Sequence, residues 1–365
     1  MTTPLPRSLS PLRIATILFV LLVAPVVQAA PFAYISNESS ATVSVIDIAT
    51  NIVVATIPVG NGPFGVAVNP AGTLVYVTNG GSNSVAVINT ATNSVVATVA
   101  VGNIPQGVAV NPAGTRAYVA NGSSNTVSVI DTAANTVVAT VTGIFAAAGV
   151  AIHPAGTLAY VTGGGMVWAI DTATNTIAAS LNTGVAPIRG IVVNSAGTRL
   201  YVAHGGNDDI YVLDAATLAI INIVDLTSGG PMGVALNPSG SRLYVTKYNG
   251  GSVSVLDTST LAVLANVPVG TQPIGVSVSP DGSRAYVAVN FPGSVAVIDT
   301  GTNAVIGSVT VGNGAAAFGL FIGGAAAPPP PPPAAIGPIP TLSEWALIML
   351  AGLMGLWGMM RLRRV

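Results

Sequence analysis

The sequence contains no cysteine, and a single lysine and two histidines add little to its small set of ionisable side chains. Without cysteine the chain has no disulfide, no thiolate nucleophile and no cysteine-based zinc site, and nothing in it can mispair in an oxidising compartment. Charged residues make up only 6% of the chain, and the formal net charge is -1. A nucleic-acid partner is excluded, because phosphate binding needs a basic footprint and only six basic side chains remain between the two ends.

What the chain has instead is apolar residues and turn formers: 51% of its residues are hydrophobic, and it contains 42 glycines and 26 prolines. A chain with so few charges needs a fold that buries apolar strands on both faces and turns often on glycine and asparagine. Helical periodicity is absent between the two ends. The composition therefore favours an all-β fold.

The first 29 residues are typical of a secretory signal peptide. Arg7 and Arg13 form a positive n-region, and residues 14–27 form an apolar h-region. Val27 and Ala29 place small residues at −3 and −1, which predicts cleavage after Ala29. The alternative is an uncleaved membrane anchor, for which the apolar stretch is short.

The other end divides into a spacer, an apolar stretch and a basic terminus. Residues 325–338 are rich in alanine and proline, and the proline run 328–333 predicts a stiff polyproline II linker. Residues 342–360 are long enough for a transmembrane helix of roughly 28 Å, at about 1.5 Å per residue. Arg361, Arg363 and Arg364 follow, and the positive-inside rule keeps them in the cytoplasm with Arg7 and Arg13. The chain between these two segments is therefore expected outside the cytoplasmic membrane.

A short motif stands at the start of the apolar stretch. It comprises Ile339, Pro340, Thr341, Leu342, Ser343, Glu344 and Trp345. Together with the span and the basic terminus, residues 339–365 resemble the IPTL-CTERM sorting signal of Gram-negative bacteria, a relative of the PEP-CTERM signals. The resemblance implies that an exosortase-like membrane protease recognises the motif, cuts near it and passes the body to the cell surface. The alternative is a plain C-terminal anchor in which Trp345 is an interfacial aromatic residue.

Between the two ends, residues 30–324 consist of one unit repeated seven times. Each unit has a tyrosine at the start of a Tyr-Val-Thr-Asn-like tetrad, and these are Tyr34, Tyr76, Tyr118, Tyr160, Tyr201, Tyr244 and Tyr286. Their spacings are 42, 42, 42, 41, 43 and 42 residues. A fixed period of this length indicates a solenoid, a propeller or an array.

Each unit contains four short apolar runs separated by turn residues, as at 107–111, 117–121, 127–131 and 137–141. These runs are rich in β-branched and aromatic residues, which predicts strands. Four antiparallel strands with short connections make one propeller blade, so the sequence predicts a seven-bladed β-propeller of four-stranded antiparallel blades. The tetrad and the Val-Ile-Asp-Thr-Ala-Thr-Asn segment resemble the YVTN β-propeller repeat family over about residues 32–324.

The strand count also predicts how the ring closes. The first unit begins near Tyr34 without an innermost strand, and the last unit is followed by an extra inner-strand pattern at residues 318–322. We therefore expect residues 318–322 to complete the first blade in a one-plus-three strand clasp, which removes free sheet edges.

Motifs that could carry chemistry are few. The run from Gly60 to Gly65 matches the letters of a phosphate-binding G-x-G-x-x-G loop, but a strand follows where a helix N-terminus is required. His153 and His204 occupy different repeat positions, and no set of converging metal ligands can be assembled. The sequence therefore predicts no catalytic constellation, no metal and no cofactor.

An aspartate ends the third run of six units, and an asparagine ends that of the other. These residues are Asp47, Asn89, Asp131, Asp171, Asp214, Asp257 and Asp299. Their regular spacing predicts that the side chains form turns by bonding to the local backbone. Arg116, Arg199, Arg242 and Arg284 stand two residues before a repeat tyrosine. Their place near the same turns favours Arg–Asp pairs.

Departures from the repeat are concentrated in the fifth and sixth units. Asp208 and Asp209 replace a neutral pair in one loop, and Lys247 and Tyr248 occupy the matching loop of the next unit. Arg189 precedes an inner-strand glycine, at a position where the other units carry uncharged residues. We expect these five residues to lie at one mouth of the channel and to form a ligand-binding site. The alternative is that they are solubilising surface charges.

Export, a sorting tail, near-regular repeats and the lack of a catalytic set favour a binding or scaffold module of the cell surface, outer envelope or matrix. Its ligand is expected to be a protein or a carbohydrate. The competing hypothesis is an enzyme, because seven-bladed propellers with related repeats resemble periplasmic lactonase-like hydrolases and quinoprotein dehydrogenases. Such an enzyme would need several ionisable groups converging on the axial mouth, or a calcium site. Only Arg189, Asp208 and Asp209 could contribute to such a cluster of ionisable groups.

Overall fold

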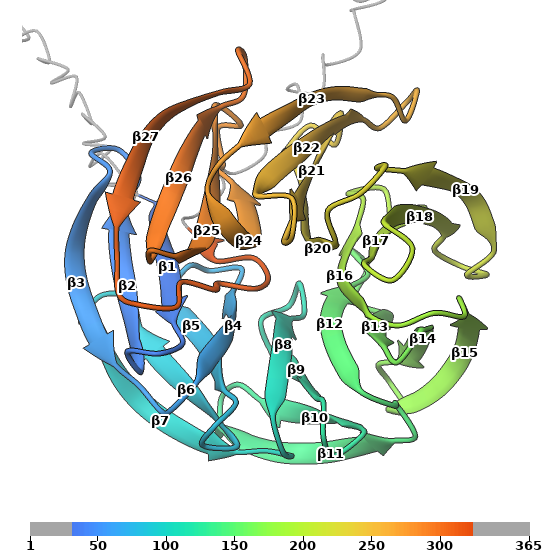
Figure 1. The fold of residues 1–365 in the computed structure, drawn as a ribbon. Coiled ribbons are helices and arrows are strands. Elements are labelled where there is room, and N and C mark those ends of the chain that lie inside the picture. Colours follow the sequence, from blue (N-terminus) through green and yellow to red (C-terminus); the bar gives the residue numbers. More distant parts are fainter. Residues whose placement is uncertain (1–30, 324–365) are drawn as a thin grey trace, which may run out of the picture.

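The computed structural model describes residues 31–323, which form 28 β-strands and no helix. The strands make seven four-stranded antiparallel sheets, arranged as blades around a central axis (Figure 1). The predicted all-β, seven-bladed propeller is confirmed. The predicted signal peptide, the predicted Ala/Pro-rich linker and the predicted C-terminal transmembrane helix lie outside the described residues. Within residues 31–323, no helix is long and apolar enough to cross a membrane.

Six blades follow the chain in order, from the innermost strand to the outermost. Blade 2 comprises β4 (Pro63–Val68), β5 (Leu74–Asn79), β6 (Ser84–Asn89) and β7 (Ser94–Ala100). Blade 3 comprises β8 (Pro105–Val110), β9 (Arg116–Asn121), β10 (Thr126–Asp131) and β11 (Thr136–Thr142). Blade 4 comprises β12 (Ala147–Ile152), β13 (Leu158–Gly163), β14 (Met166–Asp171) and β15 (Thr176–Asn182).

The later blades repeat the same order. Blade 5 comprises β16 (Ile188–Val193), β17 (Arg199–His204), β18 (Asp209–Asp214) and β19 (Ile220–Asp225). Blade 6 comprises β20 (Pro231–Leu236), β21 (Arg242–Lys247), β22 (Ser252–Asp257) and β23 (Val263–Pro268). Blade 7 comprises β24 (Thr271–Val278), β25 (Arg284–Phe291), β26 (Ser294–Asp299) and β27 (Ala304–Thr310).

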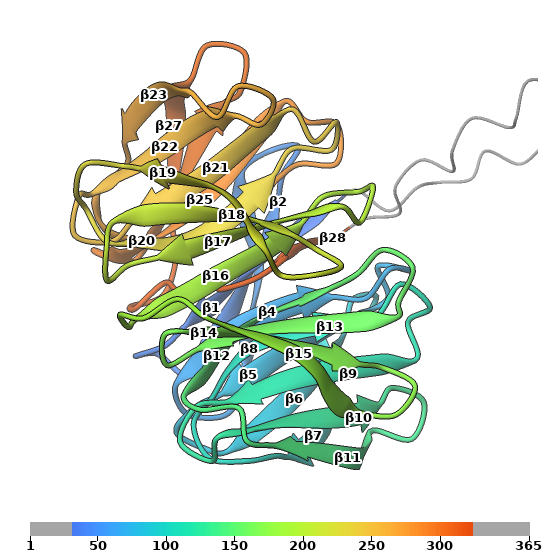
Figure 2. The same ribbon diagram turned by 90° about the vertical axis from the view of Figure 1, so that its right-hand side faces the viewer.

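Blade 1 joins the two ends of the chain. It comprises β28 (Ile322–Gly323), β1 (Phe32–Asn37), β2 (Thr42–Asp47) and β3 (Ile52–Pro58), in that order. The Tyr34 N–H donates to the Phe321 carbonyl at 2.9 Å, and β28 continues the antiparallel pairing. The predicted one-plus-three clasp is confirmed. The two ends of the described chain therefore leave the ring side by side (Figure 2).

The closing segment is less regular than the other inner strands because it serves two blades. Its Phe318 carbonyl accepts a hydrogen bond from the Val66 N–H of blade 2 at 2.9 Å. Gly319 has a φ of 118°, a conformation that side chains rarely adopt, and the regular strand is confined to two residues. Phe321 is nonetheless fully buried in the core that blades 1, 2 and 7 share.

The middle strands of each blade are buried because both of their faces pack against neighbouring blades. In β5 and β6 every residue except one at an end of the strand is buried. The outermost strands alternate instead: in β7, Val96 is 55% exposed whereas Val99 is 5% exposed. Strands enclosed on both faces carry continuous apolar runs, which explains why so few charges suffice.

The repeat tyrosine joins each blade to the next. All seven are at most 2% exposed. The Tyr160 hydroxyl donates to the Ala215 carbonyl of blade 5 at 2.7 Å, and the Tyr286 hydroxyl donates to the Ile48 carbonyl of blade 1 at 3.0 Å. Burial raises the pKa of Tyr160 to about 12, so the hydroxyl stays a neutral donor. One large side chain per repeat thus fixes the packing of adjacent blades.

The ring has two unlike faces. The hairpin face carries the turns that join the first strand of a blade to the second and the third to the fourth, and both ends of the described chain leave from it. The cleft face carries the loops that join the second strand to the third and each blade to the next. The candidate site lies on the cleft face.

Candidate functional site

A ring of glycines surrounds the axis. It consists of Gly65, Gly107, Gly149, Gly190, Gly233, Gly275 and Gly319. In six of them an added Cβ would come within 2.0–2.3 Å of a backbone carbonyl oxygen of the next blade, so the inner strands touch through their backbones. The space left at this ring is about 20 Å³, enough for roughly one water molecule. The glycine ring thus separates the two mouths of the channel.

The residues that precede these glycines face the cleft side of the ring. They are Phe64, Gln106, Ala148, Arg189, Met232, Ile274 and Phe318. A hydroxyl from the neighbouring blade fixes the backbone of several: Ser36 donates to the Phe64 carbonyl at 2.7 Å, and Thr78 donates to the Gln106 carbonyl at 2.6 Å. Thr162 donates to the Arg189 carbonyl in the same way. Phe64, Gln106 and Arg189 are partly exposed on this fixed backbone, whereas the other four side chains are buried.

Arg189 and Gln106 line a cavity of about 590 Å³ on this face. The Arg189 guanidinium donates to Gln106 Oε1 at 3.3 Å, although the two residues belong to blades 5 and 3. Ala148, which holds the corresponding position in blade 4, is small enough to let them meet across it. Burial lowers the pKa of Arg189, and the nearby Tyr248 hydroxyl has the opposite effect.

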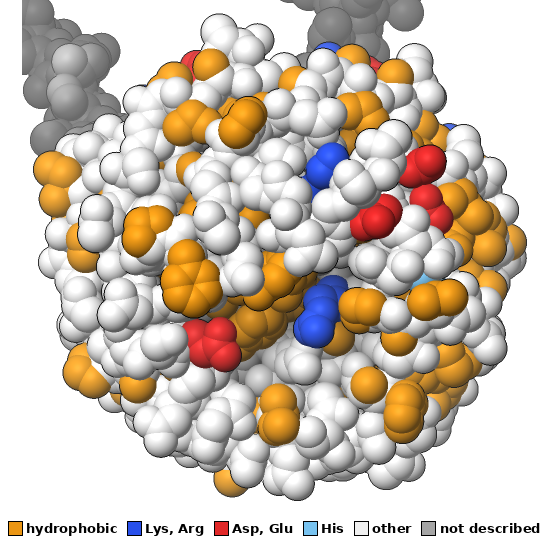
Figure 3. All heavy atoms as spheres, in the orientation of Figure 1, with side chains coloured by type: hydrophobic (Ala, Val, Ile, Leu, Met, Phe, Trp, Pro, Cys, Tyr) orange, Lys and Arg blue, Asp and Glu red, His pale blue; other side chains and the backbone are white. Residues whose placement is uncertain are grey.

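Phe64, Ile104 and Pro105 give the same cavity an apolar lining, and Phe64 packs on a buried apolar cluster. The rings of Phe64 and Phe318 lie 5.6 Å apart, and Tyr248 packs on the cluster formed by Phe318 with Met232 and Ile274. Figure 3 shows a hollow with hydrophobic side chains along its floor, a basic side chain at one side and an acidic side chain at the other. We call this hollow the cleft. Its aromatic floor is the kind of surface on which small ligands pack.

The acidic residue of the cleft, Glu38, was missed in the sequence. It lies in the loop between β1 and β2, is exposed and lines the cavity with Arg189. A signal was present, because Glu38 and Tyr248 both follow directly after a repeat tetrad, where four other units have glycine. Comparing this one position across the repeats would have found both side chains.

Of the five predicted site residues, Arg189 and Tyr248 come together at the cleft, whereas three contribute elsewhere. Asp208 has a φ of 63°, and its carboxylate accepts from the Gly230 N–H at 2.6 Å. Asn125 occupies the equivalent position with a φ of 58° and accepts from the Ala146 N–H at 2.8 Å. Asp208 therefore does what asparagine does in other blades, which is to fix the next loop.

Lys247 was expected in a surface loop, but it is the last residue of β21 and only 8% exposed. Its ammonium group donates to the Leu226 carbonyl at 3.4 Å, so the side chain supports the loop between blades 5 and 6 from below. The repeat pattern placed asparagine at this position in blades 1 to 3, where it is buried as well. The equivalent position of these asparagines in the repeat could thus have predicted that Lys247 is buried.

Asp209 lies opposite His204 on β17 and opposite Asp225 on β19. Burial raises the pKa of Asp209, and the Asp225 carboxylate adds to that effect. His204 is fully buried against Tyr211, with ring centroids 4.8 Å apart, and burial lowers the pKa of its imidazole. Within residues 31–323 no three His, Asp or Glu side chains are placed to hold a metal ion.

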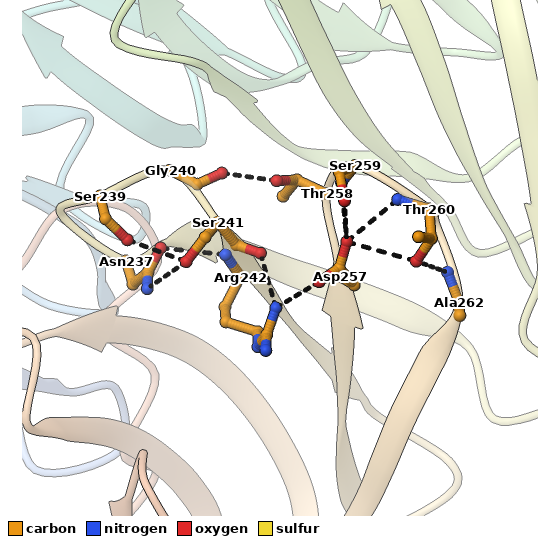
Figure 4. A network of polar contacts seen from close by, with 10 residues as sticks. All are labelled: Asn237, Ser239, Gly240, Ser241, Arg242, Asp257, Thr258, Ser259, Thr260 and Ala262. Atoms are coloured by element: carbon orange, nitrogen blue, oxygen red, sulfur yellow. Dashed lines mark hydrogen bonds and ion pairs between the residues drawn. The ribbon is translucent and has the colours of Figure 1, made fainter.

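The polar residues of the hairpin face form turns, as predicted. Asp257 Oδ1 accepts from the Ser259 and Thr260 N–H groups at 2.9 and 3.0 Å (Figure 4). The Ser259 hydroxyl and these N–H groups, with Arg242, hold the pKa of Asp257 well below its usual range. Arg242 pairs with Asp257, and Arg116 pairs with Asp131, both at 2.5 Å.

The other two arginines of this face differ from the expectation. Arg199 donates to the Thr258 carbonyl at 3.4 Å, and Arg284 donates to the Ile48 carbonyl at 3.1 Å. Both carbonyls belong to the next blade along the ring, so these arginines link blades rather than pair within one.

Comparisons with known proteins agree with this architecture. The IPTL-CTERM motif matches residues 338–364, and the family described as "Lactonase, 7-bladed beta-propeller" matches residues 25–153. No curated protein matches the sequence. Hydrazine synthase of Kuenenia stuttgartiensis is similar at 25% identity and a TM-score of 0.68, over 73% of this chain and 92% of that chain. A functionally unknown protein from Desulfotomaculum acetoxidans is similar at 17% identity and a TM-score of 0.69, over 79% and 99%.

The chain is therefore a seven-bladed β-propeller that carries an IPTL-CTERM motif at its C-terminal end. The resemblance of residues 339–365 to that sorting signal is confirmed. The motif indicates export to the cell surface and processing by an exosortase-type enzyme.

Proposed function

We propose that this protein is a surface-displayed binding module that holds its ligand in the cleft. One observation carries the proposal: Arg189, Gln106 and Glu38 line a concave, aromatic-floored site, and their side chains are not required by the repeat. The charged residues of the hairpin face, in contrast, bond to turns or to neighbouring blades. A concave apolar site with a few polar groups is what small-ligand recognition requires.

The position of the chain ends supports display in one orientation. Phe32 and Gly323 are paired on the hairpin face, and the sorting motif follows Gly323 along the chain. Attachment through the C-terminal segment would start from the hairpin face, which favours an orientation with the cleft turned away from the membrane. The partners that this proposal requires are an exosortase-like protease and a protein or carbohydrate ligand of the surface or matrix, in a Gram-negative host.

Binding is tested with the processed protein and the envelope fraction of its own host. The double variant Phe64→Ala, Arg189→Ala should lose most of the binding shown by the wild type, since it removes the aromatic ring that lines the cleft and the cation beside it. Arg199→Ala, on the hairpin face, should bind like the wild type. Equal binding by the wild type and the double variant would show that the cleft is not the site.

Orientation is tested on cells that hold the unprocessed protein. Because the chain has no cysteine, Ser123→Cys on the cleft face and Ser195→Cys on the hairpin face are each the only thiol. Both serines are exposed, and neither side chain is used in a hydrogen bond within residues 31–323. A membrane-impermeant maleimide should label the first faster than the second. The reverse order, or equal rates, would contradict the proposed orientation.

The second candidate function is a lactonase-like hydrolase, and the family match at residues 25–153 favours it. Hydrolysis would need a group that activates water, and Glu38 is the carboxylate that lines the cleft. Lactone hydrolysis by the purified protein that disappears in Glu38→Gln would favour the enzyme. Hydrolysis at the background rate by both proteins would favour the binding module.

A further inference from the structure

Arg189 is bonded differently from the other arginines of residues 31–323. The four on the hairpin face each donate to an aspartate or to a backbone carbonyl. Arg189 donates to a neutral side-chain amide, that of Gln106, and none of the ion pairs within the described residues includes it. A partly buried cation without a counter-ion is unfavourable in the free protein, so an anion that enters the cleft gains more here than at an exposed arginine.

The geometry suits one planar anion. A guanidinium presents parallel N–H groups that match the two oxygens of a carboxylate. Gln106 accepts from Arg189 through Oε1, which leaves its amide N–H groups as further donors at the same place. Thr162 and Thr78 fix the backbone of both residues, so the two side chains start from fixed positions before a ligand arrives.

The floor beside this anion site is apolar. The Phe64 ring lines the cavity and packs on the buried Phe318 ring, with centroids 5.6 Å apart, and Met232 and Ile274 belong to the same cluster. Tyr248 lies close enough to influence the Arg189 charge and also packs on this cluster. A carboxylate bound at Arg189 would therefore have its attached apolar group against aromatic rings.

Glu38 limits the charge of the ligand. Its carboxylate lines the same cavity as Arg189, so the cleft holds one positive and one negative side chain. A dianion would be repelled by Glu38 as it approaches Arg189, whereas a single carboxylate is balanced by the guanidinium. The cavity of about 590 Å³ has the size of sites for small molecules or short peptide ends.

We propose that the cleft binds a monocarboxylate joined to an aromatic or large aliphatic group, with the carboxylate on Arg189 and Gln106 and the apolar group on Phe64. The proposal rests on the binding function proposed above and names its ligand class. The same chemistry is present in a free aromatic acid and in the C-terminal residue of a peptide.

The test uses the purified, processed protein and four probes: N-acetylphenylalanine, its amide, the tripeptide Gly-Gly-Phe and phenyl phosphate. Dissociation constants come from ligand-observed NMR titration. The acid should bind at least about ten-fold more tightly than the amide, because a charge-assisted hydrogen-bonded pair is lost. Phenyl phosphate should bind more weakly than the acid in the wild type and gain affinity in Glu38→Gln. A tripeptide that binds more tightly than the acid would identify a peptide end as the source.

Arg189→Gln should abolish the preference for the acid over the amide, Arg189→Lys should keep part of it, and Arg199→Gln should keep all of it. Thermal unfolding of each variant establishes that it is folded. An acid and an amide that bind equally to the wild type would overturn the ligand class and leave the cleft as a binding site. A preference for the acid that persists in Arg189→Gln, or no binding of any probe, would also overturn it. The envelope-fraction experiment decides the binding function separately.

Discussion

The two faces of the propeller use their polar residues in opposite ways. On the hairpin face the same arrangement recurs from blade to blade, and Asp131, Asp171 and Asp257 each accept from the N–H groups two and three residues later. On the cleft face the residues before the ring glycines include two phenylalanines, a glutamine and an arginine. The two mouths of the channel also differ. The mouth on the hairpin face has a cavity of about 280 Å³ lined by aliphatic residues and prolines. The mouth on the cleft face has the charged cleft of about 590 Å³.

The difference shows how a repeat protein gains a specific site. The hairpin turns must be the same in every blade because each one has to reverse the chain, and Asx turns do so with local hydrogen bonds. The glycine ring and the threonine hydroxyls fix the cleft backbone without using the side chains above it. Partly exposed side chains of the cleft face, such as Gln106 and Arg189, can therefore be exchanged at little cost to the fold.

The largest effect on stability is expected from a substitution that weakens the closure of the ring, because both faces depend on that closure. Phe321→Ala removes a fully buried side chain from the core of the closing blade, and we expect a loss of about 3–5 kcal/mol in the free energy of unfolding. Leu320, its neighbour, is 60% exposed, so Leu320→Ala should change stability little. Denaturant unfolding of the two variants measures the difference. Similar losses in both would contradict the role assigned to the clasp.

The second prediction concerns the glycine ring, which separates the two mouths of the channel. In Gly149→Ala the new Cβ would stand 2.1 Å from the Arg189 carbonyl oxygen, and backbone cannot yield as a side chain can. We expect a loss of about 1–3 kcal/mol, as for overpacked cores. Gly307→Ala is the matched control, because its Cβ would meet nothing within 4 Å. A Gly149→Ala protein as stable as the control would mean that the blades are not in backbone contact at the axis.

An Asp→Asn substitution should change the stability of the folded protein in opposite directions on the two faces. Burial and Asp225 raise the pKa of Asp209, so its charged form destabilises the folded protein above the folded-state pKa. Asp209→Asn should therefore stabilise at neutral pH, and the gain should vanish as the pH falls below the ordinary value of 3.8. On the hairpin face, hydrogen bonds from Thr174 lower the pKa of Asp171, so Asp171→Asn should slightly destabilise at neutral pH. Melting temperatures from pH 3 to pH 7 compare the two; changes of the same sign would refute the contrast.

The smallest expected effect concerns the buried histidine of blade 5. Because burial lowers the pKa of His204, the folded state binds its proton less well than the unfolded chain does. The resulting stability is present at neutral pH and is lost as the pH falls through about 6.5, the ordinary histidine value. His204→Asn restores the residue found at this position in blades 1 to 3 and should remove that part of the pH dependence. An unchanged pH profile between 7 and 5 would show that His204 does not titrate on unfolding.

Much of the fold could be predicted from the sequence because its signals are local and repeated. The tyrosine period fixed the number of blades, and the unpaired pattern near Phe318 indicated the clasp. The aspartate turns were also predicted, since an Asx turn needs only a few consecutive residues. The hydrogen bonds of Arg199 and Arg284 were not predicted, because the accepting carbonyls lie on the next blade and their positions depend on how the blades pack.

The candidate site was predicted in part. Arg189 and Tyr248 stood out as departures from the repeat, and the structure brings both to the cleft. Asp208 and Lys247 stood out in the same way, but one fixes a loop and the other is buried beneath it. A departure from a repeat reveals that a position is unusual, and its surroundings decide whether the side chain meets solvent, backbone or ligand.

The sequence by itself determined the seven blades, their four strands, their turns and the sorting motif near the C-terminal end. These follow from residue periodicity, turn chemistry and short motifs, all of which act over a few residues. Only the tertiary structure decided that Arg189 reaches Gln106 across Ala148 and that Glu38 lines the same cleft. Residues from blades 1, 3 and 5 meet there because ring closure brings together positions far apart in the chain, and no local pattern encodes that meeting.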